Sequence, residues 1–186
     1  MRKLIYSMSV SLDGYIAGPR GEFDWSEPDE ELHRFHNDRV RELSMHILGR
    51  RLYEVMSYWE TAEERNPSAP EYTLEFARIW KALPRIVYSK TLTTVEGNAR
   101  LSQADPVEEV LELKREPGKD MAVGGADLAA AFMRRNAIDE YQLFVNPVIL
   151  GGGRPFFASL DERVELELLE TRTFSSRVTY LRYARA

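Results

Sequence analysis

The pair Gly124 and Gly125 lies where a short apolar run meets a helix-forming segment. Without side chains, the backbone at such a junction can approach a ligand closely, and the free N–H groups at a helix start suit a phosphate. The same pair also suits a tight turn, and it is not a complete dinucleotide-binding fingerprint. The residues therefore leave a phosphate site and a plain turn as two open interpretations.

Gly49, Arg50 and Arg51 follow a second apolar run, residues 45–48. Open α/β sheets bind their ligands at the carboxyl ends of the strands, and two arginines can hold a phosphate through paired N–H donors. Solvated arginines at a helix start are the alternative. Taken alone, the segment slightly favours this plainer interpretation.

Three consecutive glycines, Gly151, Gly152 and Gly153, follow the apolar residues 148–150. Such a run costs considerable chain entropy, so we expect a close approach that compensates for it. The approaching group is either a ligand or another backbone segment. We favour a ligand wall.

Acid–base and metal chemistry have little support among the other polar residues. Asp13 follows the first predicted strand, where it can bond a substrate or stabilise its own turn, and the turn is favoured. His33 and His36 are three residues apart on a predicted helix, and His46 lies ten further on. No carboxylate completes a metal-ligand spacing with them, so we predict no metal site.

Serine catalysis also lacks support. Ser7, Ser9 and Ser11 alternate along the first predicted strand, but no serine lies in a G-x-S-x-G nucleophile elbow. The sequence therefore does not predict a hydrolase triad.

The composition is that of one globular domain. The chain has 186 residues, of which 44% are hydrophobic and 30% charged, so we expect a single domain over residues 1–186. It has no cysteine, which excludes disulfides and thiolate metal sites and is typical of the cytoplasm. The net charge of −5 disfavours nucleic acid as a partner. No apolar run is long enough for a membrane span, and the alternating start of the chain is typical of a strand rather than a signal peptide.

Strand and helix patterns alternate along the whole chain. We expect one α/β sheet, mainly parallel, with flanking helices and an antiparallel C-terminal hairpin. A helix should begin near Ser26, with Asp29 in a capping-box position. Strands are predicted over residues 2–12, 45–48, 85–88, 121–123, 140–145, 164–171 and 177–183. The further helices are predicted over residues 53–59, 72–83, 107–111 and 126–135.

Taken in chain order, several motifs resemble the reductase domain of riboflavin biosynthesis, within the dihydrofolate reductase-like superfamily. The motifs that carry this resemblance are SLDGYIA at 11–17, LGRR at 48–51, YSKT at 88–91, VGGA at 123–126 and LGGG at 150–153. They cover about residues 2–184. The resemblance implies a dihydrofolate reductase-like fold, an NADPH cofactor and a homodimer.

The resemblance also assigns expected roles to residues of this chain. Gly49, Arg50 and Arg51 would hold the adenosine phosphate side of the cofactor, and Ser89, Lys90 and Thr91 would border its adenine and ribose phosphate. Gly124, Gly125 and Ala126 would face the pyrophosphate, with a cis peptide between the two glycines. Asp13, Ile16, Ala17 and Trp25 would lie near the nicotinamide and the substrate, and Gly151, Gly152 and Gly153 would close the pocket.

Two features of this chain depart from the family pattern. Leu52 stands where relatives often carry a threonine, so one hydrogen bond to phosphate, worth about 1 kcal/mol, is missing. The zinc deaminase domain of the bifunctional riboflavin enzyme is absent from this chain, which has no cysteine to ligate such a metal.

We expect an NADPH-dependent reductase that transfers a hydride to a C=N or C=O bond of a small polar substrate, such as a pterin-, pyrimidine- or ribityl-like compound. The proton could come from Asp13, from a helix residue such as His33, or from ordered water. A non-catalytic ligand-binding or regulatory protein on the same fold is the first alternative. Dihydrofolate reductase is the second, but Asp29, Glu30 and Glu31 lie too early on the first helix to bind a pterin convincingly.

Overall fold

An eight-stranded sheet, in the order β5-β4-β3-β6-β1-β7-β10-β9, forms the centre of the computed structural model, which describes residues 1–186. The strands of this sheet are β1 (Leu4–Ser11), β3 (Met45–Gly49), β4 (Arg85–Tyr88), β5 (Ala99–Ser102), β6 (Met121–Gly124), β7 (Glu140–Asn146), β9 (Leu166–Thr173) and β10 (Thr179–Arg185). The short strands β2 (Tyr15–Ala17) and β8 (Arg154–Pro155) pair separately. The α-helices are α1 (Glu30–Arg41), α2 (Arg50–Met56), α3 (Tyr58–Arg65), α4 (Glu71–Ala82), α5 (Pro106–Arg115) and α6 (Ala126–Arg134).

The strands from β5 to β7 run parallel to one another, and the hairpin β9–β10 joins them antiparallel through β10. β1 lies between β6 and β7 and pairs in parallel with both. This arrangement confirms the predicted α/β fold with a mostly parallel sheet and a C-terminal antiparallel hairpin.

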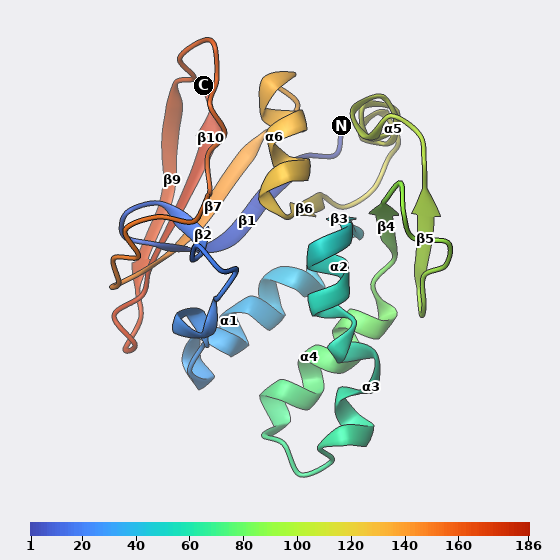
Figure 1. Cartoon of the computed structure of the whole chain (residues 1–186), viewed down its shortest axis with the longest axis vertical. Coiled ribbons are helices and arrows are strands. Elements are labelled where there is room, and N and C mark those ends of the chain that lie inside the picture. The colour runs from blue at the N-terminus through green and yellow to red at the C-terminus, as the bar shows by residue number, and fades with distance from the viewer.

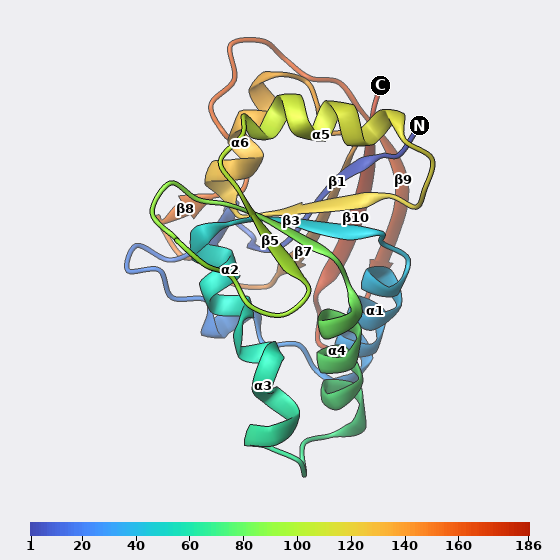
Figure 2. The ribbon, with the colours of Figure 1, turned by 90° about the vertical axis from the view of Figure 1, so that its right-hand side faces the viewer.

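Helices cover both faces of the sheet (Figures 1 and 2). α5 and α6 lie on one side, whereas α1 lies against the other side with α3 and α4 stacked beyond it. None of these helices has the length and apolar character that a membrane crossing requires.

The two faces of the sheet are packed differently, and the alternation along β1 shows why. Successive side chains of a strand point to opposite faces. Leu4, Tyr6 and Val10 point toward α5 and α6 and belong to a core of fifteen buried residues. The opposite face holds two clusters of five buried residues each, one centred on Phe144 and Tyr180 and the other on Trp80. The α1 side is therefore not filled by one continuous core.

The element boundaries differ from the sequence prediction at several places. α1 begins at Glu30, because the Asp29 side chain itself accepts the Leu32 N–H as N-cap, while Ser26 ends the 3₁₀ turn η1 (Asp24–Ser26). The single helix predicted over residues 53–59 is two helices, α2 and α3, and the strands β2, β5 and β8 were not predicted.

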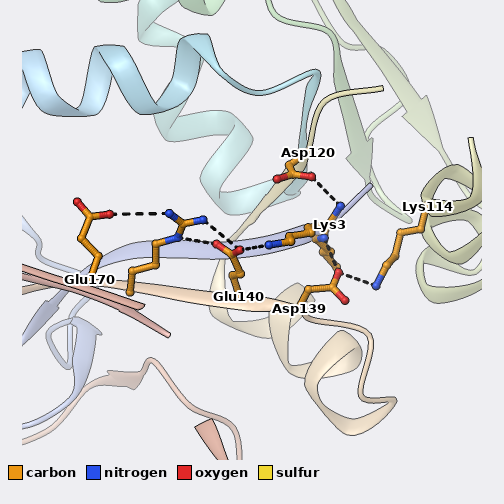
Figure 3. A network of polar contacts seen from close by, with 8 residues as sticks. Lys3, Lys114, Asp120, Asp139, Glu140 and Glu170 are labelled. Carbon is orange, nitrogen blue, oxygen red and sulfur yellow. Dashed lines mark hydrogen bonds and ion pairs between the residues drawn. The ribbon is translucent and has the colours of Figure 1, made fainter. Parts of the chain in front are cut away.

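A network of ion pairs holds the amino-terminal edge of the parallel strands (Figure 3). Glu140, which has no exposed surface, accepts from Lys3 Nζ at 2.6 Å and from Arg182 Nε at 2.7 Å. Asp139 accepts the Leu4 N–H at 2.7 Å and pairs with Lys114 Nζ at 2.6 Å. The starts of β1 and β7 and the middle of β10 are thus tied together by charge.

Replacing Glu140 tests this edge. We expect Glu140→Gln to lower the free energy of unfolding by about 3 kcal/mol at pH 7, because it leaves Arg182 and Lys3 without their buried counter-charge. Urea unfolding measures the difference, with Glu162→Gln in an exposed loop as the control.

The same variant has a predicted pH dependence. Burial alone would raise the pKa of Glu140, but the bonds from Arg182 and Lys3 outweigh it and hold the pKa below its usual value. The carboxylate therefore stabilises the fold above about pH 4.3, and this contribution is lost as the pH falls through the lower pKa of the folded state. The difference between the two proteins should shrink in acid. A difference that grows as the pH falls would contradict this assignment.

Candidate active site

The parallel register brings three of the predicted loops to one edge of the sheet. Leu48 of β3 pairs with Gly124 of β6, and Gly49 pairs with Tyr88 of β4. The segments that follow these strands therefore start side by side at the carboxyl edge. Arg50 Nη1 donates to Thr91 Oγ1 at 3.1 Å, which joins two of the segments directly.

Two helix starts at this edge offer unoccupied N–H groups. Gly49 and Gly125 are the N-cap residues of α2 and α6, and neither N-cap makes a side-chain hydrogen bond to its helix. The positive end of the helix dipole adds to the attraction for an anion. Arg51 and Lys90 are exposed nearby and form no salt bridge. The edge has the chemistry of a phosphate-binding site.

The diglycine lies directly under Leu52. A Cβ on Gly124 would come within 2.3 Å of Leu52 Cδ2, whereas Gly125 adopts a φ of +96°, which disfavours any side chain. No peptide bond in the structure is cis, so the expected cis bond between the two glycines is not observed. A side chain at Gly125 would therefore strain the backbone whatever space surrounds it.

Asp13 ties the turn after β1 to the glycine-rich loop. Its carboxylate accepts the N–H groups of Leu150 at 3.1 Å and Gly151 at 2.7 Å, and the hydroxyl of Ser11 at 2.7 Å. The bond from Ser11, followed by the two backbone bonds, holds the pKa of Asp13 below its usual value. The structure thus places Asp13 in a loop-positioning role.

Gly153 makes the close approach expected of the three glycines, and the approaching group is backbone. Its φ is +131°, and a Cβ would lie 2.1 Å from the carbonyl oxygen of Ala17. Gly152 has space around it, with Pro19 Cγ 3.9 Å from an added Cβ. The contact between β2 and β8 therefore explains Gly153 without a ligand wall.

A cavity of about 440 Å³ lies beneath α1, on the face where the core is divided. One part is apolar and is lined by Leu52, Met56, Trp59 and Phe76 from α2, α3 and α4. Gly124 lines the cavity as well, and therefore belongs both to the cavity and to the carboxyl edge of the sheet.

Polar side chains line the middle of this cavity. Ser7 and Ser9 of β1 and Gln142 of β7 come from the sheet, while His33 and His36 come from α1 and His46 from β3. All three histidines of the chain thus line one cavity.

The histidines are uncharged at neutral pH. Burial lowers the pKa of His36 to about 4, with a smaller contribution from His33 when that ring is protonated in acid. Burial and the nearby Arg85 lower that of His46 to about 4. Burial also lowers the pKa of His33, although its Nδ1 lies 3.1 Å from Asn37 Oδ1.

Comparison with known proteins gives a family for this architecture. The model of the RibD C-terminal domain matches residues 2–180. The chain belongs to the RibD C-terminal domain family. The uncharacterized protein YyaP of Bacillus subtilis is 32% identical over 183 residues, which cover 98% of this chain and 94% of YyaP.

Solved structures agree with this fold. A putative riboflavin biosynthesis protein from Shewanella sp. PV-4 has a TM-score of 0.76 at 23% identity, covering 100% of this chain and 99% of that one. Dihydrofolate reductase from Enterococcus faecalis, solved with NADP(H), has a TM-score of 0.63 at 16% identity, covering 98% and 96%. The predicted dihydrofolate reductase-like fold is confirmed.

Within this RibD-type domain, the predicted site residues fall into separate groups. The carboxyl edge of β3, β4 and β6 brings together most of the expected cofactor residues, namely Gly49, Arg50, Arg51, Ser89, Lys90, Thr91, Gly124, Gly125 and Ala126. Of the expected substrate residues, Ile16 packs against the main core, and Trp25 donates to the Glu22 carbonyl at 3.3 Å. Asp13, Ile16, Trp25 and Gly153 do not line the cavity.

The sequence analysis missed the polar lining of the cavity. One signal was present in the sequence, because a central parallel strand is usually apolar on both faces. Serines at positions 7 and 9 of such a strand indicate a polar space beside it. Gln142 and His46 join them only through strand pairing.

The contact of Gly153 with Ala17 can be tested by a matched pair of variants. We expect Gly153→Ala to lower the free energy of unfolding by about 3 kcal/mol, because it combines backbone strain with a clash. Gly152→Ala should leave stability unchanged or raise it by up to about 1 kcal/mol. Thermal unfolding of both variants decides the matter, and equal stability of the two would contradict the assigned contact.

Proposed function

We propose that this protein is an NADPH-dependent reductase that transfers a hydride to a C=N or C=O bond of a small polar substrate in the cavity beneath α1. The observation that carries the proposal is the position of Gly124, which belongs to the phosphate-binding edge and also lines the cavity. A cofactor held by its phosphates at this edge could therefore reach the cavity with its other end.

The residues at the edge fit such a cofactor. The N–H groups at the start of α6, after Gly125, suit a pyrophosphate. Arg51 and Lys90 supply two unpaired cations for a further phosphate, and Arg50, whose Nε lies 3.8 Å from Glu54, supplies a third. When bound, NADPH supplies the hydride, and the protein orients the reactants and excludes water.

The contacts of Leu52 show what this chain has in place of the threonine that relatives often carry. Its side chain packs over Gly124 and joins Met56 and Trp59 in the apolar part of the cavity. The hydroxyl that relatives offer to a phosphate is thus replaced here by an apolar wall beside the diglycine. We infer that Leu52 positions the reactive end of the cofactor.

The source of the proton follows from the charges of the candidate groups. Asp13 has a lowered pKa and is therefore ionised at neutral pH, and its oxygens accept two backbone N–H groups. His33 has a lowered pKa and is uncharged. We infer that solvent entering the cavity delivers the proton.

Dihydrofolate reduction is not favoured by the cavity. The residues of α1 that line it are His33, His36, Arg39 and Val40, and none is a carboxylate. Asp29 caps the helix, and Glu31 accepts from Ser175 and Arg172. The helix therefore presents no acid to a pterin ring.

The proposed activity is tested by titrating the protein with NADPH and then following NADPH oxidation with a panel of carbonyl and pterin compounds. We expect binding, and oxidation with at least one member of the panel. Binding without any oxidation would favour a ligand-binding or regulatory protein. Failure to bind NADPH would contradict the proposal.

Cofactor selectivity gives a second test. We expect Arg50→Ala and Arg51→Ala each to weaken NADPH binding about tenfold and NADH binding much less, because a hydrogen bond to a charged phosphate is worth about 1.5 kcal/mol or more. Calorimetric titration of both cofactors measures this, with exposed Arg134→Ala on the far end of α6 as the control. Equal losses for the two cofactors would mean that these arginines do not bind the 2′-phosphate.

A further inference from the structure

We propose that the group of the substrate that enters the cavity beneath α1 is uncharged, hydrogen-bonds through both donors and acceptors, and carries neither phosphate nor carboxylate. This inference rests on the proposed function and specifies the chemical class of its substrate. It follows from the charges and the hydrogen-bonding state of the residues that line the cavity.

The two cations of the cavity are already paired. Arg182 donates from Nε to Glu140 at 2.7 Å, and its Nη1 lies 3.8 Å from Glu170. Arg39 donates from Nη2 to the same Glu170 at 2.5 Å and stacks over the rings of Phe35 and Tyr180, while its Nε is buried and has no partner. Two arginines are thus balanced by two glutamates, so no free positive charge faces an anionic substrate.

The two acids of the cavity are engaged as well. Asp120 accepts the backbone N–H of Lys3 at 2.8 Å, and Glu42 lies 3.5 Å from Lys119 Nζ. Asp120 precedes β6 and Glu42 precedes β3, so both lie at the amino-terminal edge, away from the diglycine. Glu42 thus has a counter-ion, and Asp120 is held by the backbone just before β1 at this edge, so neither acid is placed to pair with a cationic group beside the diglycine.

A different set of polar side chains in the cavity has no partner in the protein. Ser7, Ser9, His36, His46 and Gln142 line the cavity, and their side chains make no hydrogen bond within the chain. His46 Nδ1 is buried and unpartnered, and Gln142 is only 5% exposed. Buried polar groups are normally hydrogen-bonded, so these side chains are available to a ligand.

The chemistry of this set matches a neutral partner. A serine hydroxyl, a glutamine amide and a neutral imidazole each donate and accept, and the lowered pKa values of His36 and His46 keep both rings uncharged. An ionised group placed among them would lose its hydration without gaining a counter-ion, which is strongly unfavourable. A neutral ring or chain carrying amide, carbonyl or hydroxyl groups would satisfy both functions of each side chain.

Cross-strand pairing places these groups in line with the paired charges. Ser7 pairs with Gln142, Gln142 with Arg182, and Arg182 with Glu170. Along this row, the neutral side chains of Ser7 and Gln142 are followed by the paired charges of Arg182 and Glu170. The cavity volume of about 440 Å³ is within the range of small-molecule sites.

Matched probe pairs that differ by one charged group test the inference. The pairs are uridine with uridine 5′-monophosphate, and pterin with pterin-6-carboxylate, titrated calorimetrically into the protein saturated with NADP⁺ and into the protein alone. We expect the neutral member of at least one pair to bind at least tenfold more tightly than its anionic partner. An anionic member that binds as tightly as the neutral one, or no binding by any of the four probes, would overturn the inference.

Variants assign the binding to the cavity. Gln142→Leu should weaken binding of the neutral probe about fivefold, because it removes one donor and one acceptor, without lowering the unfolding temperature. Gln103→Leu in an exposed loop is the matched control and should bind like the wild type. Unchanged binding by Gln142→Leu would place the probe outside the cavity and overturn the inference.

The titrations also separate this inference from the proposed function. Loss of NADP⁺ binding with a retained preference for neutral probes would contradict the reductase proposal alone. Retained NADP⁺ binding with a preference for anionic probes would contradict the uncharged-substrate inference alone.

Discussion

The parallel pairing of β1 with β6 on one side and with β7 on the other is the constraint on which the remainder of the structure depends. A central strand has one row of side chains for each face of the sheet. In β1 the row facing α5 and α6 is Leu4, Tyr6 and Val10, which supplies the core. The opposite row contains Ser7 and Ser9, which are too small and too polar to fill the space beneath α1.

The same pairing joins this space to the edge where phosphates are expected to bind. β6 lies beside β1 and ends at Gly124. The same strand pairing therefore places Gly124 at the carboxyl edge of the sheet and in the lining of the cavity. The ion pairs around Glu140 join the strands at the other edge of the sheet and balance the charges of Lys3 and Arg182. The carboxyl edge thus has the unpaired cations Arg51 and Lys90. The two arginines that line the cavity, Arg39 and Arg182, are each paired with a glutamate.

Features that depend on chain order were predictable from the sequence. The grouping of Gly49, Arg50 and Arg51 with Gly124 follows from apolar runs that become neighbouring parallel strands, whose carboxyl ends must meet at one edge. The division of the sheet into a parallel part and an antiparallel hairpin follows from the same patterns.

Features that depend on three-dimensional backbone geometry were not predictable. Gly153 is required by the carbonyl of Ala17, more than a hundred residues away in the sequence, and Asp13 is occupied by the N–H groups of Leu150 and Gly151. His36, His46 and Gln142 meet only through the packing of α1 and the register of β3 and β7. Only the serines of β1 indicated the cavity in the sequence itself.

A crystal structure of the complex with NADP⁺ tests the central claim most directly. The account predicts that the pyrophosphate lies against the start of α6 beside Gly124 and Gly125, and that the nicotinamide lies at the mouth of the cavity beside Leu52. A cofactor bound with its nicotinamide outside the cavity, or bound elsewhere on the sheet, would contradict it.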